Sequence, residues 1–261
     1  SSGFPPLTFP RPLVTVDIVM FTVLGDALQV LLVKRPADTD EPFPGKWALP
    51  GGFVNIDEDA TLLDCALRKL REKTGVVTPY LEQLGSWGGA QRDPRGWSAT
   101  HCFYALIPAQ AMQLRSGANA TEVAWFEVDA ASRKRLAFDH GELLDAAVAR
   151  LRGKVEYTSL PAFLLEEPFT LPALQHTYEV VLGRAVDKSA FRKRMLDAMG
   201  GTPAVNIVPD GRLVNASQMY LVNGKWVAIT KIGDWFGEKI AIDVAEGKKL
   251  FFGKSCNGCH G

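Results

Sequence analysis

A Gly-Gly pair followed by a short helix is the feature of this sequence that most restricts its fold. Residues 47–54 have the pattern of a short strand interrupted by Gly51-Gly52. Residues 60–73 then repeat apolar side chains at helical spacing, and Gly75 follows as a typical helix end. Strand-like runs lie on both sides of this segment. The pattern therefore predicts an α+β domain in which one early helix is built in among strands.

The strand-like runs share alternating or continuous apolar residues bounded by turn residues. Two of them, at 13–24 and 28–33, are separated by Gly25-Asp26, which predicts a strand, a tight turn and a second strand. Further runs follow the helix at 81–87, 99–107 and 123–128. A predicted helix over about 141–151 ends this first domain.

The residues after about 153 have a different pattern, in which two short helices follow one another. Thr170 is placed to cap a helix that Gly183 ends, and Asp187 is placed to cap a second helix over 188–199. The second helix is basic on its outer face. This pattern fits a helix-turn-helix and also fits an ordinary helical hairpin. Strand-like runs then appear at 218–222 and 225–229.

Length and charge limit the classes of protein that fit. A chain of 261 residues predicts two domains with a possible appendage. Its 29 basic and 29 acidic residues balance, so any contact with nucleic acid must come from a local basic patch. No apolar run reaches the roughly 18 residues that a membrane helix needs. The N-terminus has no signal-peptide pattern, and we expect a cytoplasmic protein that makes no membrane contact.

The helix over 60–73 belongs to a motif associated with metal chemistry. Gly51 to Val54 together with Ala66 to Val76 resembles the Nudix box, in which glutamates on one helix face hold Mg²⁺. The box residues that match are Arg68, Leu70, Glu72, Gly75 and Val76. Lys69 and Lys73 occupy the positions of the other two glutamates, and Ala60 lies where a further glutamate is expected, with Glu58 close by.

Two lysines in place of two carboxylates change what this motif does. An ammonium group has no lone pair to offer a metal ion, and metal-assisted hydrolysis needs a bound cation. We therefore expect no metal ligands and no catalytic residues here. Two roles remain open for Lys69 and Lys73, which either meet a diphosphate directly or are solvated surface lysines.

The resemblance extends over roughly residues 11–200. It is carried by the segments 11–17, 46–54, 91–97, 137–141, 154–159, 169–179 and 182–194. These segments are similar to NrtR, the family of Nudix-related transcriptional regulators of NAD metabolism. The resemblance implies a Nudix-like α/β/α sandwich with a mixed sheet over 1–152 and a winged helix-turn-helix over 153–235. It favours DNA binding over the plain helical hairpin, and it leaves residues 236–261 as a tail of unknown role.

The function implied by this resemblance is that of a repressor of NAD metabolism genes. Its members sense ADP-ribose, so the implied partners are double-stranded DNA, an ADP-ribose-like nucleotide and a second copy of the chain. The alternative is an active Nudix hydrolase of ADP-ribose or a related nucleotide, which alone would need Mg²⁺. The candidate ligand-binding residues are Arg35, Trp47, Phe53, Lys69, Glu72, Lys73, Arg92 and Arg95. The candidate DNA-binding residues are Thr170, Lys188, Ser189, Arg192, Lys193 and Arg194.

The end of the sequence carries a pattern that fits neither domain. Cys256, Cys259 and His260 have the spacing of a c-type haem attachment site. The sequence stops one residue later, so it provides no cytochrome core and no second axial ligand, and it has no export signal. We therefore expect no haem. The same residues are also incomplete as a Zn²⁺ site.

Overall fold

The computed structural model describes residues 10–76, 80–111, 121–166, 169–198, 212–213, 219–222 and 225–228. The described residues form two compact units, each made of three stretches of chain. The first unit takes those within 1–21, 29–105 and 112–150, and the second takes those within 22–28, 106–111 and 151–261. The last change of unit along the chain lies near residue 150, and the β1–β2 turn and residues 106–111 group with the second unit. The predicted tail, with Cys256, Cys259 and His260, lies outside the described residues.

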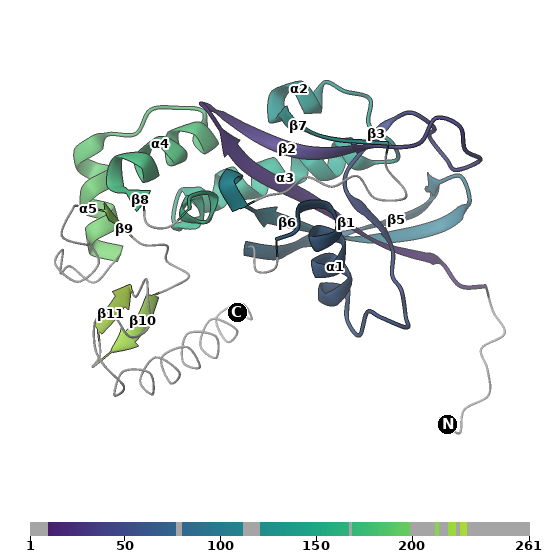
Figure 1. The fold of residues 1–261 in the computed structure, drawn as a ribbon, viewed down its shortest axis with the longest axis horizontal. Helices are drawn as coiled ribbons and strands as arrows, with labels where there is room; N and C mark the ends of the chain where they lie inside the picture. The colour runs from purple at the N-terminus through teal and green to yellow at the C-terminus, as the bar shows by residue number, and fades with distance from the viewer. Residues whose placement is uncertain are drawn as a thin grey trace. The chain divides into compact units, whose positions relative to one another are not determined.

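A seven-stranded sheet organises the first unit (Figure 1). Its strands are β1 (Leu13–Leu24), β2 (Ala27–Lys34), β3 (Trp47–Ala48), β4 (Gly51–Phe53), β5 (Tyr80–Asp93), β6 (Gly96–Leu106) and β7 (Glu122–Glu127). The order is β3-β2-β1-β6-β5, with β4 paired to β1 and β7 paired to β2. Both of these pairings are antiparallel.

The central strand β1 makes the sheet mixed. Thr15 bonds to residues 99 and 100, and Thr22 bonds to Ile107, so β1 and β6 advance in the same direction. Residues 15–22 of β1 are all buried. A strand buried on both faces reads as a nearly continuous apolar run, which is the pattern of this segment. The predicted α+β fold with a mixed sheet is confirmed.

Three helices accompany the sheet: α1 (Leu62–Thr74), α2 (Val128–Ser132) and α3 (His140–Val155). Thr61 and Asp64 form a capping box at the start of α1, because each side chain accepts from the other's backbone N–H. Gly75 ends the helix in the left-handed conformation, with φ of 72°, and donates to the Arg71 carbonyl. The glycine end predicted from the sequence is therefore confirmed, and α1 packs beside β4.

The second unit contains the predicted helix pair, α4 (Leu171–Leu182) and α5 (Lys188–Ala198). Thr170 caps α4, Gly183 ends it with φ of 68°, and the Asp187 carboxylate accepts from the Ala190 N–H at the start of α5. The remaining elements are η1 (Ala109–Ala111), η2 (Leu160–Leu164), β8 (Phe169–Thr170), β9 (Arg212–Leu213), β10 (Met219–Val222) and β11 (Lys225–Ala228). Strands β10 and β11 form an antiparallel hairpin, and β8 pairs with β9.

Aromatic packing holds α4 against α5. The rings of Tyr178 and Phe191 meet edge to face, with centroids 5.0 Å apart, and both side chains are buried. The Tyr178 hydroxyl donates to the Thr158 carbonyl at 2.6 Å, which satisfies its polar end. Among the described residues, no helix is both long and apolar enough to cross a lipid bilayer.

Candidate functional site

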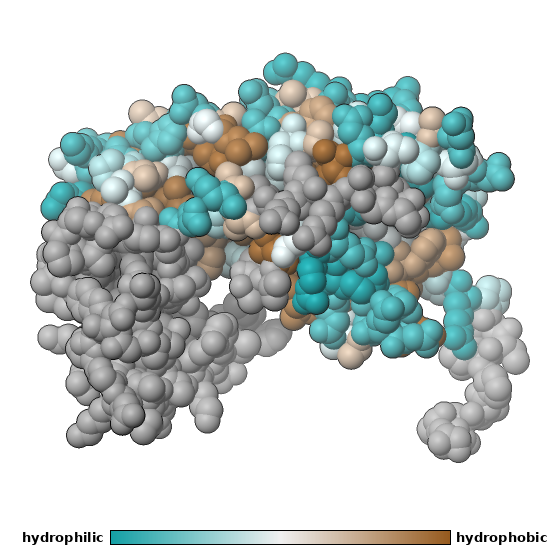
Figure 2. All heavy atoms as spheres, in the orientation of Figure 1, coloured by the Kyte–Doolittle hydropathy of each residue, from teal (hydrophilic) through white to brown (hydrophobic). Residues whose placement is uncertain are grey.

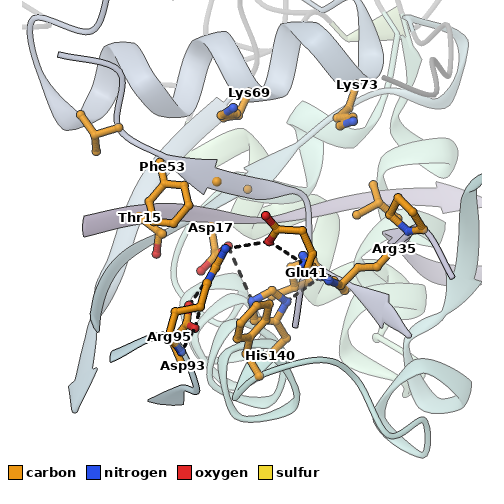
Figure 3. Close-up of a pocket in the computed structure, with 18 of the residues that line it drawn as sticks. Thr15, Asp17, Arg35, Glu41, Phe53, Lys69, Lys73, Asp93, Arg95 and His140 are labelled. Atoms are coloured by element: carbon orange, nitrogen blue, oxygen red, sulfur yellow. Dashed lines mark hydrogen bonds and ion pairs between the residues drawn. The ribbon is translucent and has the colours of Figure 1, made fainter. Parts of the chain in front are cut away.

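An open pocket of about 760 Å³ lies between β1, β4, α1, the β5–β6 turn and the loop after β2 (Figure 3). The side chains that line it are unusually rich in charge. The lining includes Thr15, Asp17, Arg35, Glu41, Phe53, Asn55, Arg68, Lys69, Lys73, Arg92, Asp93, Arg95, Phe138 and His140. In Figure 2 the described surface over α1 is mainly hydrophilic, in keeping with the charged residues on that helix.

The two glycines of β4 let the backbone pass close to β1 and α1. A Cβ atom on Gly51 would lie 2.1 Å from Asp17 Oδ1 and 2.6 Å from the Val16 carbonyl oxygen. Gly52 has φ of 150°, and a Cβ there would lie 3.3 Å from the Lys69 ammonium. Neither position accepts a side chain without displacing its neighbours. The Gly-Gly pair is therefore what brings strand and helix together at the pocket.

A buried ion cluster forms the floor of the pocket. Arg92 lies between two carboxylates, 2.9 Å from Asp17 and 2.8 Å from Asp139. The side chains of Arg92 and Asp17 are only 6% and 7% exposed, so solvent screens this pair weakly. The cluster fixes β1, β5 and the start of α3 to one another.

His140 completes the floor as a neutral side chain. Its Nδ1 accepts a hydrogen bond from the Leu49 N–H at 2.8 Å, which leaves the proton of the neutral ring on Nε2, 3.6 Å from Asp17. Burial lowers the pKa of His140, and the Asp17 carboxylate opposes that effect less strongly. The histidine thus supports the loop before β4 and acts as a hydrogen-bond acceptor for that backbone.

Arginine and carboxylate pairs also form the rim of the pocket. Glu41 contacts both Arg35, at 3.5 Å, and Arg95, at 2.7 Å. Arg95 also pairs with the buried Asp93 at 2.9 Å and lies 5.0 Å over the ring of Phe53. Burial lowers the pKa of Arg35, whereas the hydrogen bonds that Arg95 donates to Asp93 raise the pKa of Arg95. Phe53 is 44% exposed and presents an apolar face at this rim.

On α1, Arg68 has a structural role. Its guanidinium donates to both oxygens of Asp59, at 2.8 and 2.6 Å, and to Glu72 at 3.0 Å. Asp59 is buried and also accepts from the Asn55 N–H. This bidentate pair ties the loop after β4 to the helix. Arg68 also pairs with Glu72, so the Glu72 carboxylate is held at the helix surface.

The Asp59–Arg68 pair makes stability depend on acid pH. The hydrogen bonds from Arg68 hold the pKa of Asp59 well below its usual value, so its contribution is fully present above pH about 4 and is lost as pH falls further. Asp59→Asn is expected to lower the free energy of unfolding by about 2–3 kcal/mol at neutral pH. It should also make that free energy depend less on pH in the acid range. Urea unfolding across the acid range measures this. Asp57→Asn, at an exposed carboxylate, is the control and should reproduce the wild-type curve.

Lys69 and Lys73 project from α1 toward the pocket (Figure 3). Lys69 lies 3.7 Å from Glu72, whereas Lys73 is buried and has no hydrogen bond or ion pair within the part of the chain that the structure describes. Burial lowers the pKa of Lys73. Among the described residues no three His, Cys, Asp or Glu side chains are placed to hold a metal ion. These residues do not fit the Mg²⁺ site that a Nudix box implies.

The structure brings most of the predicted ligand-binding residues together. Those that line the pocket are Arg35, Phe53, Lys69, Lys73, Arg92 and Arg95. Two lie outside the lining: Trp47 packs against Phe126, with ring centroids 4.8 Å apart, and Glu72 is held by Arg68. Sequence reasoning missed Asp17, Glu41, Asp93 and His140. Asp17, Asp93 and His140 do fall in segments that carry the family resemblance, but their spacing along the chain indicated no role.

The predicted DNA-binding residues divide into two groups. Lys188, Ser189, Arg192 and Lys193 are exposed on α5. Thr170 and Arg194 also have structural roles, because the Thr170 hydroxyl caps α4 and the Arg194 guanidinium lies 4.9 Å over the Tyr178 ring. Arg194 is half-buried and also donates to the Glu156 carbonyl at 3.0 Å. The exposed basic surface of α5 is therefore smaller than the sequence predicts.

Both units match known protein families. A family model for the NUDIX domain matches residues 12–147, and a model for the NrtR DNA-binding winged helix domain matches residues 161–200. The ADPR responsive transcriptional repressor NtrR of Acinetobacter baylyi is 46% identical over 190 residues, which cover 73% of this chain and 74% of that protein.

Solved structures of Shewanella oneidensis NrtR resemble the chain as well. NrtR complexed with a 27mer DNA is 40% identical with a TM-score of 0.66, covering 82% of this chain and 90% of that one. The NUDIX domain of that NrtR, complexed with ADP ribose, is 43% identical with a TM-score of 0.52, covering 57% of this chain and 95% of that one. Together with the Nudix pocket and the helix pair, these matches show that the chain belongs to the NrtR family of Nudix-related transcriptional regulators.

Proposed function

We propose that this protein is a transcriptional repressor of NAD metabolism genes that binds ADP-ribose in its Nudix pocket without cleaving it. The observation that carries the proposal is the composition of the α1 face. Every support of the pocket is in place, including the β4 glycines and the Asp59–Arg68 pair, while Lys69 and Lys73 stand where metal-binding carboxylates would be needed. A pocket that keeps its shape and loses its metal ligands is suited to binding rather than hydrolysis.

The pocket suits the chemistry of ADP-ribose. A diphosphate carries negative charge that ammonium and guanidinium groups recognise, and Lys69, Lys73, Arg35 and Arg95 supply such groups. The exposed ring of Phe53 offers an apolar face to the base or a ribose. The relative whose structure was solved with ADP ribose matches this unit over 95% of its own chain.

The second unit suits binding to the major groove of DNA. The basic side chains of Lys188, Arg192 and Lys193 lie exposed on the second helix of a helix-turn-helix pair. Such side chains mainly contact phosphates and set the register of the helix on the duplex. We propose that two copies of the chain act together as a homodimer, which places two half-sites about 34 Å apart.

The absence of hydrolysis is the first test. Incubating the protein with ADP-ribose and Mg²⁺ or Mn²⁺ is expected to return the nucleotide intact, because one surface glutamate cannot hold the cation that activates water. Chromatographic measurement of AMP decides the question. Rapid AMP formation that Glu72→Gln abolishes would instead establish the alternative, an active hydrolase with unusual metal ligands.

The response to ligand is the second part of that test. Titrating the protein onto a duplex from the region upstream of its own gene, with and without ADP-ribose, is expected to give two different dissociation constants, since a sensor must couple its two sites. Equal constants at saturating ADP-ribose would rule out the sensing role while leaving DNA binding intact.

A further inference from the structure

The cationic side chains of the pocket differ in whether their charge is already matched. Arg92 is held by Asp17 and Asp139, Arg68 by Asp59, and Arg95 by Asp93. Arg35 donates to the Pro42 carbonyl at 2.7 Å and contacts Glu41, and Lys69 contacts Glu72. Of the cations that line the pocket, only Lys73 has no hydrogen bond or ion pair among the described residues. The unpaired positive charge that an incoming anion meets is therefore on α1.

Lys73 is also the most deeply placed of the α1 cations. The residue is only 8% exposed, yet it lines the pocket. Lys69 lies one turn earlier on the same helix face, with its ammonium beside Gly52, where the missing side chain leaves space. Lys73 lies in the last turn of α1, where the helix dipole favours positive charge. The helix thus presents two ammonium groups to one side of the pocket.

The Lys73 side chain is largely buried and its ammonium, which faces the pocket, has no partner among the described residues. Partial burial of an unpaired charge is unfavourable, and a bound anion reduces that penalty. We propose that Lys73, assisted by Lys69, binds the ligand's diphosphate directly in place of a divalent cation, so that binding needs no metal. This rests on the proposed function for the identity of the ligand. The proposal places the diphosphate on the α1 lysines and not on the rim arginines, whose charges are already matched by Glu41 and Asp93.

The titration of Lys73 gives a second consequence of this arrangement. Burial lowers the pKa of Lys73, and among its charged neighbours Lys69 lowers it further while Glu72 raises it. A phosphate placed against the ammonium raises that pKa again. Affinity is therefore expected to fall as pH rises through the pKa of the unliganded lysine, and proton uptake on binding is expected within that pH range. Calorimetry in buffers of different ionisation enthalpy measures the uptake.

The decisive experiment measures ADP-ribose affinity with EDTA and with Mg²⁺. The wild-type dissociation constant is expected to agree within about twofold between the two buffers. Lys73→Gln is expected to weaken binding by about 10- to 100-fold, the range for losing one hydrogen bond to a charged group. Lys73→Arg should retain part of the affinity. Arg71→Gln removes the same charge from the exposed face of α1 and is expected to leave affinity unchanged.

A charge reversal sharpens the test. The double variant Lys69→Glu/Lys73→Glu is expected to bind ADP-ribose only when Mg²⁺ is present, because it restores oxygen ligands on the helix face. Lys73→Gln removes an unpaired charge from a largely buried residue, so its melting temperature should be at or above that of the wild type, which excludes unfolding as the cause of weak binding. A wild-type protein that requires Mg²⁺, or unchanged affinity in Lys73→Gln, overturns the proposal.

Inorganic pyrophosphate separates this proposal from the proposed function. Pyrophosphate binding that is insensitive to EDTA and abolished in Lys73→Gln supports the lysine site even if ADP-ribose itself fails to bind. In that case the identity of the ligand is wrong and the anion site stands. ADP-ribose binding that strictly needs Mg²⁺ would instead contradict the metal-free lysine site and leave the proposed sensing function intact.

Discussion

Replacing Arg92 with leucine is expected to lower the free energy of unfolding by about 3–5 kcal/mol, the range for breaking a buried ion pair by removing one partner. Arg92 spans Asp17 and Asp139, and its loss leaves both carboxylates near the pocket floor without their cation. Urea unfolding monitored by circular dichroism measures the change. Arg92→Lys should lose less, because it keeps the charge but cannot reach both carboxylates with a planar fork.

The matched control is an exposed pair in the same unit. Lys34 lies 3.5 Å from Glu122, with side chains 41% and 53% exposed, so Lys34→Gln is expected to cost less than about 1 kcal/mol. Adding Asp17→Asn and Asp139→Asn to Arg92→Leu should restore part of the lost stability, since it removes the unpaired charges. If Arg92→Leu and Lys34→Gln cost the same, the cluster does not hold the pocket floor.

Neutralising the exposed face of α5 is expected to have the largest effect on DNA binding. The triple variant Lys188→Gln/Arg192→Gln/Lys193→Gln should weaken binding by about 100- to 1000-fold, because each basic side chain that neutralises a phosphate releases counterions. The slope of log affinity against log salt should become less steep by about 0.9 for each phosphate that is no longer neutralised. Fluorescence anisotropy with the upstream duplex, repeated over a salt series, measures both quantities.

A second basic triplet provides the control for bulk charge. Arg133, Lys134 and Arg135 follow α2 in the first unit, and changing all three to glutamine alters the net charge by the same amount. This control is expected to change the salt slope little. Equal slopes for the two triple variants would mean that α5 has no special place in the interface. Arg194→Met should destabilise the helix pair without changing the slope, because its guanidinium packs on Tyr178.

Local signals in the sequence predicted the fold well because they act within a few residues. The capping residues Thr170 and Asp187 and the helix ends at Gly75 and Gly183 each act on backbone groups nearby, and each lies where expected. The lysines on α1 were also recognisable, since residues four apart share a helix face. These features need no knowledge of how distant segments meet.

The pocket floor and the rim could not be predicted in this way. Asp17, Arg92 and Asp139 come from β1, the end of β5 and the start of α3, and only the folded sheet brings them within hydrogen-bonding distance. Arg194 shows a second limit of prediction from residue type. Its charge suggested a role at the DNA surface, but two aromatic rings and the Glu156 carbonyl take up its guanidinium. Residue type indicates what a side chain is able to bind, whereas packing decides what it does bind.

The two lysines on α1 also determine which quantity sets the occupancy of the pocket. In an enzyme that cleaves its ligand, the occupied fraction of the binding site depends on how fast turnover empties it. On the proposed function, in which ammonium groups take the positions of the metal-binding carboxylates, the ligand leaves the pocket in the form in which it entered. Occupancy is then an equilibrium quantity set only by concentration and dissociation constant, so the protein measures a metabolite without drawing down its supply.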